Sequence, residues 1–519
     1  MDNTILDVNE TLAHAHEQGQ ETAFVLDREL LARAIQQGIE RAARNRDTQQ
    51  VLVSMTQPLT WHDPLDAFSA CLRSTLGESF FWERPAESTA LVGVGCATAL
   101  ETRGTTRFTD AASQWRTLMR DAVIARSPTV CATYGCGPTL FGGFTFDPLT
   151  PHTDLWHDFP GGLLVLPTLL LSYGPDGAAL TLNRMVCVDD SVERRVQELA
   201  QAVTSLVSSI ASIPTTRRAE TLPQYTLDMR DLLPASEWQR RVENVASEIR
   251  AGKYEKVVLA RGVRVTPRPN EDVSEDESTR QRQQQSAFEI ETVLRRLRRA
   301  YPGAYVFAMQ RGTRFFVGAT PERLVQAQDG NIYTMALAGS APRGATPAED
   351  ERIGNALLQS EKNRTEHAIV VGQVEAVLAQ HCHHVEVARE PRLLKLKNVQ
   401  HLETPVKGTL LPQRCILDVI ADLHPTPAVG GFPREDALAT IRRVEQLDRG
   451  WYAGPLGWIG ASGHGEFAVA LRSGLIEQSE ATLFAGCGIV GDSEPRSEYE
   501  ESRLKLQVML RSLGEMEKE

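Results

Sequence analysis

Short apolar runs bounded by turn residues recur along almost the whole chain and constrain its fold more than any other feature. Strands are predicted where such runs favour extended backbone, as at 90–95 (ALVGVG), 141–146 (FGGFTF) and 256–265 (KVVLARGVRV). Helical spacing of apolar residues predicts helices at 27–44, 191–212, 236–251 and 493–513. The longest apolar stretch, 161–171, is too short to cross a membrane and contains Pro167. Strands and helices are therefore expected in both halves of the chain.

Changes in composition divide the chain into regions. A lead-in with one helical segment covers 1–50, and a polar connector with two prolines at 212–224 separates 51–225 from 226–519. Within the last region, 267–286 is charged and almost free of apolar side chains. Such a segment cannot bury enough apolar surface to fold alone, so we expect a flexible surface insertion.

The charge balance excludes some classes of partner. The 519 residues include 55 Lys and Arg against 67 Asp and Glu, which gives a net charge of −12. Nucleic acid and anionic membrane surfaces require clustered cations, so neither is expected as the main partner. On net charge alone, an anionic substrate is not expected either. The N-terminus lacks a basic segment followed by an apolar core, which predicts a cytoplasmic protein.

Three segments look like known motifs but lack the context that those motifs need. The glycine spacing at 486–491 (GCGIVG) fits a dinucleotide-binding loop, but no strand with an acidic residue follows. What remains is a glycine pair whose bare amides can closely approach a small ligand. HCHH at 381–384 and the pair Cys131 and Cys136 have no second half at zinc-site spacing. A surface turn and two core cysteines explain them better.

Acidic residues on two predicted helices are candidate cation ligands. Glu498, Glu501 and Lys505 are spaced by three and four residues, so they share one helix face. The segment EKNRTEH at 361–367 begins a second, otherwise apolar helix. Carboxylates from two helices could hold a hard cation such as Mg²⁺. The alternative is a pair of solvated, salt-bridged helix faces.

Glu322 and Lys256 each have a structural and a chemical interpretation. Glu322 follows Thr-Pro after a strand, where it could simply favour the positive end of a helix dipole. If it is buried instead, a raised pKa would let the carboxyl donate a proton near neutral pH. Lys256 opens a strand, where a lysine often protects a sheet edge. Desolvation or a neighbouring cation lowers the pKa of a lysine, which could then act as a base.

Ordered sequence blocks in the second half show a family resemblance. The blocks are YEKVVLAR (254–261), FFVGATPERL (315–324), LAGSAPRG (337–344), EKNRTEH (361–367), VQHLETPVKG (399–408), LHPTPAVGGFPRE (423–435), RGWYAGPLGW (449–458), FAVALRSG (467–474) and AGCGIVGDSEPRSEYEESRLK (485–505). In this order they resemble the chorismate-utilising enzymes, which include anthranilate, aminodeoxychorismate, salicylate and isochorismate synthases. The first 230 residues match loosely, at FFWERP (80–85) and FPGGLLVLP (159–167).

The resemblance implies an α+β fold in which two β-sheets pack between helical layers, an αββα sandwich built by internal duplication. The chorismate-binding catalytic region would be 226–519, and 51–225 would form the less well matched half. Position by position, the resemblance assigns Glu366 and Glu501 to Mg²⁺, with Glu498 beside them through water. The residues assigned to chorismate are His401, Tyr452, Arg472, Gly486, Gly488 and Lys505. At Asn363 several relatives carry an acid, so an outer contact to the metal is in doubt there.

Two positions distinguish activities within the family. Members that attack with ammonia tend to have a neutral amide at Lys256, whereas members that attack with water use a lysine base, and Glu322 would then be the acid. Members that also eliminate pyruvate usually have threonine at Ala428. The resemblance therefore implies a Mg²⁺-dependent isochorismate synthase, an isomerase, with menaquinone biosynthesis favoured over a siderophore or salicylate pathway. A salicylate synthase and a catalytically silent regulatory homologue are the alternatives.

Overall fold

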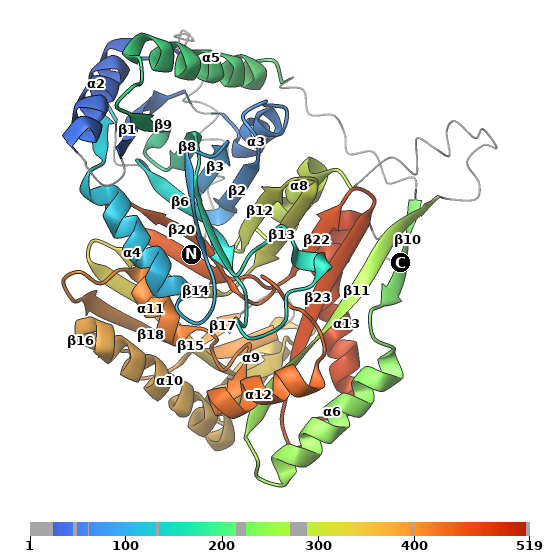
Figure 1. Ribbon diagram of the computed structural model, residues 1–519. Coiled ribbons are helices and arrows are strands. Elements are labelled where there is room, and N and C mark those ends of the chain that lie inside the picture. The colour runs from blue at the N-terminus through green and yellow to red at the C-terminus, as the bar shows by residue number, and fades with distance from the viewer. Residues whose placement is uncertain are drawn as a thin grey trace, which may run out of the picture.

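The computed structural model describes residues 24–44, 49–60, 62–130, 134–213, 225–269, 288–395 and 399–514. Within them, two β-sheets of 13 and 10 strands face each other across a buried apolar layer (Figure 1). Helices α2 (Arg28–Arg44), α3 (Pro64–Leu72), α5 (Val192–Ala211), α8 (Ile290–Ala300) and α13 (Pro495–Leu513) bury apolar residues on the outer face of the larger sheet. Helices α4 (Arg107–Arg120), α10 (Glu361–His381) and α11 (Ile416–Leu423) pack on the smaller sheet. The predicted αββα sandwich is confirmed.

The larger sheet runs through both halves of the chain without a break. Its order is β10 (Tyr225–Asp231), β11 (Lys256–Pro269), β23 (Glu480–Ile489), β22 (Ser473–Glu477), β13 (Arg314–Thr320), β12 (Tyr305–Arg311), β2 (Ser79–Arg84), β3 (Thr89–Val94), β8 (Leu169–Gly174), β9 (Gly177–Cys187), β1 (Gln50–Leu59) and β5 (Val123–Arg126). The short strand β19 (Gly431–Phe432) also pairs with β11. Helices α6 (Ala235–Arg250) and α12 (Arg434–Val444) lie near this end of the sheet.

The smaller sheet has the order β16 (Cys382–Val387), β18 (Val399–Leu410), β15 (Asn331–Pro342), β14 (Arg323–Gln328), β21 (Gly465–Val469), β20 (Pro455–Gly460), β6 (Thr139–Phe144), β7 (Gly162–Leu166) and β4 (Thr98–Thr102). Strand β17 (Arg392–Lys395) pairs with β18, and α9 (Pro347–Gln359) lies between β15 and α10 in the chain. Two short 3₁₀ helices, η1 (Pro85–Glu87) and η2 (Asp154–Trp156), complete the described elements.

The strand orders show the internal duplication. In the larger sheet, β1, β9, β8, β3 and β2 of the first half lie in this order towards the middle of the sheet. Their counterparts in the second half, β11, β23, β22, β13 and β12, lie in the same order from the opposite side. In the smaller sheet, β4, β7 and β6 correspond in the same way to β14, β21 and β20. The flanking helices α2, α3 and α5 occupy the same places in the chain order as α6, α8 and α13. The two halves are therefore copies of one unit that meet at β2–β12 and β6–β20.

The second half contains one large segment that the first half lacks. In the first half β4 leads directly into α4, whereas in the second half β15, α9, α10 and β16 to β18 lie between β14 and α11. These strands extend the smaller sheet beyond β14. The inserted segment carries Glu366 on α10 and His401 on β18.

Most of the predicted elements are present, and the differences have local causes. The apolar run at 161–174 forms two strands separated by Pro167 and Thr168, because proline cannot donate to a strand ladder. Strand β11 continues to Pro269 because β10 pairs with its far end, so 267–269 are strand and not insertion. The rest of the predicted insertion, Cys131 and residues 1–23 lie outside the described residues.

Two local predictions are wrong. HCHH at 381–384 is not a surface turn: His381 ends α10, Cys382 starts β16, and buried His381 lies 2.7 Å from the Asp422 carboxylate. No helix follows Glu322, which lies between β13 and β14, so the helix-dipole interpretation fails.

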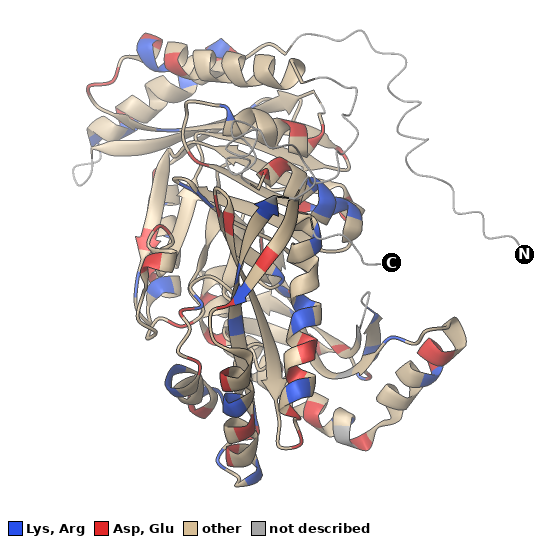
Figure 2. Cartoon of the chain, turned by 90° about the vertical axis from the view of Figure 1, so that its right-hand side faces the viewer, with Lys and Arg blue, Asp and Glu red and all other residues tan. Residues whose placement is uncertain are grey.

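The surface and the helices agree with the earlier charge and hydropathy patterns. Figure 2 shows Lys and Arg interspersed with Asp and Glu over the helices on the side in view. Among the described residues, no helix is both long enough and apolar enough to span a bilayer.

Candidate active site

Two glycines of β23 lie next to Lys256 of the adjacent strand β11 and next to Tyr452, which precedes β20. Val258 pairs with Gly488 in the ladder, and Ala260 pairs with Gly486. A Cβ atom at Gly488 would lie 2.8 Å from Lys256 Cε, and one at Gly486 would lie 3.4 Å from Tyr452 Oη. Contacts at 2.8 Å are shorter than carbon atoms allow, so only glycine leaves the lysine its position. The glycine pair found in the sequence thus makes room for side chains as well as baring its amides.

Two helices bring carboxylates to this end of the strands. The Lys256 ammonium lies 3.8 Å from the Glu366 carboxylate of α10. On α13, Lys505 Nζ lies 2.7 Å from Glu501 and donates a hydrogen bond of 2.9 Å to the Gly486 carbonyl. Helices far apart in the sequence therefore converge on one charged cluster.

Glu322 lies close enough to Arg472, Lys256 and Lys505 for their charges to act on its carboxyl. Its backbone N–H donates to Thr320 Oγ1 at 3.3 Å, and its carbonyl accepts from the Val469 N–H at 3.0 Å, so both strand ends fix its backbone. Burial raises the pKa of the Glu322 carboxyl to about 7, although the cations of Arg472, Lys256 and Lys505 act in the opposite direction. A carboxyl with this pKa is partly protonated at neutral pH and can donate a proton.

Arg472 has an unusual backbone conformation between β21 and β22. Its φ of 51° is in the left-handed region, which is uncommon for a residue with a side chain. The Arg472 carbonyl accepts from the Ala319 N–H at 3.1 Å, which helps to hold that conformation. Burial lowers the pKa of its guanidinium, yet the group stays charged at any physiological pH. Local strain at such a position is typical of functional sites.

Two neutral polar side chains line the same region. Burial raises the pKa of the Tyr452 phenol, so this group remains a hydrogen-bond donor. Burial, together with the Lys505 and Arg472 cations, lowers the pKa of His401 to about 4. His401 is therefore a neutral imidazole at pH 7 and does not repel nearby cations.

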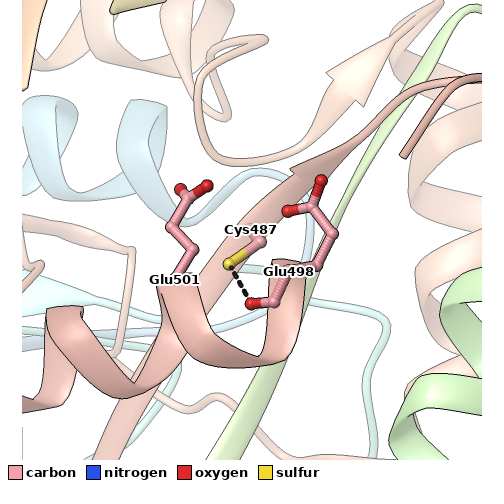
Figure 3. Close-up of side chains that lie close together, drawn as sticks. All are labelled: Cys487, Glu498 and Glu501. Atoms are coloured by element: carbon pink, nitrogen blue, oxygen red, sulfur yellow. Dashed lines mark hydrogen bonds between the residues drawn. The ribbon is translucent and has the colours of Figure 1, made fainter. Parts of the chain in front are cut away.

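Glu498 and Glu501 form a candidate metal site with the nearby Cys487. One ligand atom from each of the three lies within 4.8 Å of the others, and both carboxylates extend from the first turns of α13 (Figure 3). Ser493 Oγ donates to Glu498 at 2.7 Å, and burial raises the pKa of the Glu498 carboxyl.

The chemistry of these donors fits a hard cation. Cys487 donates its thiol to the Glu498 carbonyl oxygen at 3.2 Å, and burial raises the pKa of that thiol to about 12. A protonated thiol is a poor metal ligand, which leaves the carboxylates of Glu498 and Glu501 as donors in this group. The Glu366 carboxylate lies outside the group and faces the Lys256 ammonium. Carboxylate oxygens with room for water suit Mg²⁺.

Ala428 and Asn363 are held by backbone and capping contacts. Ala428 lies in a turn in which the N–H groups of Val429 and Gly430 both donate to the Thr426 carbonyl. This turn packs on β11, because the Val258 N–H donates to the Gly430 carbonyl at 3.0 Å. Asn363 Nδ2 donates to Ser360 Oγ at 2.8 Å, next to the N-terminus of α10. The amide of Asn363 is thus used at the helix end.

No role was predicted for Cys487, which lies on β23, or for Glu445 and Arg449, which contact β11. Cys487 lies inside the glycine motif, and Arg449 opens the block RGWYAGPLGW. Glu445 and Arg449 are spaced by four residues, like any solvated helix pair, yet their side chains are only 2% and 3% exposed. Spacing alone could not reveal that burial.

The chain is similar to known proteins along most of its length. A family model described as chorismate binding enzyme matches residues 35–514. The isochorismate synthase MenF of Bacillus subtilis is 38% identical over 466 residues, which is 89% of this chain and 94% of that protein. The salicylate biosynthesis isochorismate synthase of Pseudomonas aeruginosa is 37% identical over 89% of this chain and 90% of its own length. The solved structure of the menaquinone-specific isochorismate synthase of Escherichia coli shares the fold, with a TM-score of 0.68 at 23% identity over 92% of this chain and 99% of that chain.

Proposed function

The chain belongs to the chorismate-binding enzymes, and from this premise we propose that it is an isochorismate synthase. It converts chorismate to isochorismate by adding water at C2 of the ring while the C4 hydroxyl leaves. One observation carries this proposal: Lys256, a potential base, lies in one cluster with Glu322, a buried carboxyl whose pKa is about 7. A potential base and a partly protonated acid held in one cluster are what a paired proton transfer needs.

The substrate is a dianion, and the cluster offers groups that bind carboxylates. Arg472 supplies a planar guanidinium, Lys505 supplies a point charge, and the Tyr452 phenol supplies a neutral donor. The bare amides at Gly486 and Gly488 allow a carboxylate to approach the backbone. These local cations outweigh the net charge of −12, which is a property of the exterior. The expectation against an anionic substrate, which was based on net charge, therefore does not apply to this cluster.

Glu366 and Glu501 would hold Mg²⁺ directly, and Glu498 would hold it through water. When bound, Mg²⁺ would neutralise the ring carboxylate and withdraw electron density from the conjugated diene. The carboxylates that would hold Mg²⁺ come from two helices, α10 and α13, so both helices must be in place for the reaction. Removal of the metal with a chelator should therefore stop turnover.

Lys256 and Glu322 move the two protons. Neutral Lys256 takes a proton from the water that attacks C2, and the ring double bonds shift as the C4–O bond breaks. Protonated Glu322 gives its proton to the departing hydroxyl, which leaves as water. One water is consumed and one is released, so the step is an isomerisation. Each proton transfer by a positioned group contributes roughly 10²- to 10⁴-fold.

The same arrangement supports isochorismate as the final product. A lyase step would eliminate pyruvate from isochorismate, and the relevant family members usually have threonine where this chain has Ala428. Methyl and hydroxyl groups differ in hydrogen bonding, so Ala428 removes a donor that the lyase members have. We also propose that the product feeds menaquinone biosynthesis, supported by 38% identity to the MenF of B. subtilis over 94% of that protein. Deletion of the gene should then abolish menaquinone.

A product assay tests the proposal. Purified protein is incubated with chorismate, with Mg²⁺ or with a chelator, and the products are separated by chromatography. Mg²⁺-dependent isochorismate without salicylate or pyruvate is expected. Salicylate with pyruvate would identify a salicylate synthase, a use compatible with the relative from P. aeruginosa, and no consumption of chorismate would identify a silent homologue.

A further inference from the structure

Strand β11 has a gap along its outer edge, directly after Lys256. On that edge β19 pairs only with Lys256 and Val257, and β10 pairs only from Val263 onward. The Val258 N–H donates to Gly430, and the Gly262 carbonyl accepts from Leu232, at 3.0 Å each. Between them, the Val258 carbonyl and both backbone groups of Ala260 face no strand. Buried backbone groups of this kind must find partners.

Three buried side chains supply those partners. Glu445 Oε2 accepts from the Ala260 N–H at 2.7 Å, and Arg449 Nη2 donates to the Val258 carbonyl at 2.7 Å. The Trp238 indole N–H donates to the Ala260 carbonyl at 3.3 Å. The Glu445–Arg449 pair thus takes the place of the missing strand, because its carboxylate and guanidinium provide one acceptor and one donor at the spacing of the ladder.

The same pair holds the turn that contains Ala428. Arg449 Nη1 donates to the Val429 carbonyl at 3.1 Å, while its Nε donates to Glu445 Oε1 at 2.6 Å. A single guanidinium therefore joins β11, the 426–430 turn and Glu445. Its planar fork has fixed directions, so it sets the distance between the two backbone segments in a way that a lysine cannot.

We propose that Glu445 and Arg449 are positioning residues for the reaction. They fix the start of β11 against the 426–430 turn, so that Lys256 stays packed over Gly488 and beside Glu366. They touch none of the reacting atoms themselves. The proposal deepens the proposed function, and it rests on that function for the role of Lys256.

The test compares Arg449→Lys and Glu445→Gln with a matched pair elsewhere. The control is Arg298→Lys, which disturbs the Arg298–Glu83 pair of 2.7 Å between α8 and β2. In folded Arg449→Lys we expect kcat to fall roughly 10- to 100-fold with KM for chorismate within about 3-fold, since small displacements of a reacting group cost this much. Arg298→Lys should keep kcat within about 2-fold, a change equivalent to less than ~0.5 kcal/mol.

A readout independent of activity examines the strand edge. Hydrogen exchange followed by mass spectrometry should show at least about tenfold faster exchange in peptides covering 256–262 and 426–430 of Glu445→Gln, because a lost hydrogen bond of about 1.4 kcal/mol corresponds to tenfold. Exchange in β2 and α8 should stay unchanged. The variant Trp238→Phe removes the indole N–H together with one ring of a buried side chain, and it should speed exchange in 256–262 but not in 426–430.

Each result decides the proposal. Folded Arg449→Lys and Glu445→Gln with kcat no lower than the control would overturn it, as would a thermal destabilisation without faster local exchange. If Arg449→Lys does not fold, Glu445→Gln and Trp238→Phe carry the same test. A wild-type protein that makes no isochorismate contradicts the proposed function instead, and the exchange data then still decide whether the pair fixes the strand.

Discussion

The two halves of this molecule use the same place in their sheets in opposite ways. In the first half, β1 and β9 occupy the place that β11 and β23 occupy in the second. The first half fills its inner face with buried polar side chains that bond to one another. Ser54 Oγ donates to Asn183 Oδ1 at 2.7 Å, and the hydroxyls of Thr56 and Thr181 lie 3.0 Å apart.

The second half leaves that face almost bare. The corresponding strands present Val258, Ala260, Gly486 and Gly488. Small residues leave space for Lys256 and Tyr452, which the first half fills with hydroxyl and amide groups. The inserted segment then adds Glu366 and His401, for which the first half has no counterpart. The charged cluster of the second half therefore required two changes to the common unit: removal of side chains from two strands and addition of a segment that brings charge.

The largest expected effect comes from removing the proton-transfer groups of the second half. Lys256→Ala and Glu322→Gln should each lower kcat by about 10²- to 10⁴-fold, because a positioned acid or base contributes that much. Calorimetric binding of chorismate and Mg²⁺ should stay within a few-fold of wild type. The matched change in the first half, Thr181→Val, should leave kcat within about 2-fold. Near-normal turnover by Lys256→Ala would refute its role as base.

Adding a side chain at one of the glycines of β23 should have the next largest effect. Gly488→Ala places a Cβ atom 2.8 Å from Lys256 Cε, so the lysine must move while the backbone does not. We expect kcat to fall roughly 10- to 100-fold, because the base is displaced by about 1 Å. The melting temperature should hardly change. Gly303→Ala, with no atom within 4 Å of the added Cβ, is the control and should alter neither quantity.

The pH dependence of activity and of stability should report on the Glu322 carboxyl of the second half. The hydroxyl and amide groups of the first half do not titrate and should not contribute to it. Because Glu322 must be protonated and its pKa is about 7, the fraction of protein in which this acid can donate falls about tenfold for each pH unit above that value. Its folded pKa is raised above the unfolded value, so the folded state loses stability as pH rises from about 4.5 to about 7. Glu322→Gln removes that loss and should be more stable than wild type at pH 8, by on the order of 1–3 kcal/mol, and not at pH 4. Equal stability differences at both pH values would contradict burial of the carboxyl.

The smallest effect is expected in the filled half. Ser54→Ala leaves Asn183 Oδ1 without its donor and should lower the free energy of unfolding by about 1 kcal/mol. Chemical denaturation measures this loss, and steady-state kinetics should show no change in kcat. A drop in activity without a drop in stability would mean that the two halves are coupled more closely than their contacts suggest.

The sequence predicted the second half better than the first for a physical reason. Lys256, Glu322 and Glu501 stand in sequence contexts that are unusual for strands and helices, such as an acid directly after Thr-Pro, and blocks around such residues are recognisable. Ser54, Thr56 and Asn183 are ordinary residues for a strand, and no spacing rule shows that they bond to one another inside a protein. The Glu445–Arg449 pair was missed for the same reason, since four-residue spacing is typical of solvated helix faces.

The strand pairings between the two halves indicate how a chain with an internal duplication can arise. Both central pairings, β2 with β12 and β6 with β20, are antiparallel, as a two-fold axis through the middle of each sheet requires. A half-length chain would expose β2 and β6 as unpaired edge strands, and it would bury them by binding a second copy of itself. Such a symmetric homodimer carries two equivalent sites. Tandem fusion of its genes makes the copies free to diverge, so one copy can fill its site and contribute stability while selection refines the other.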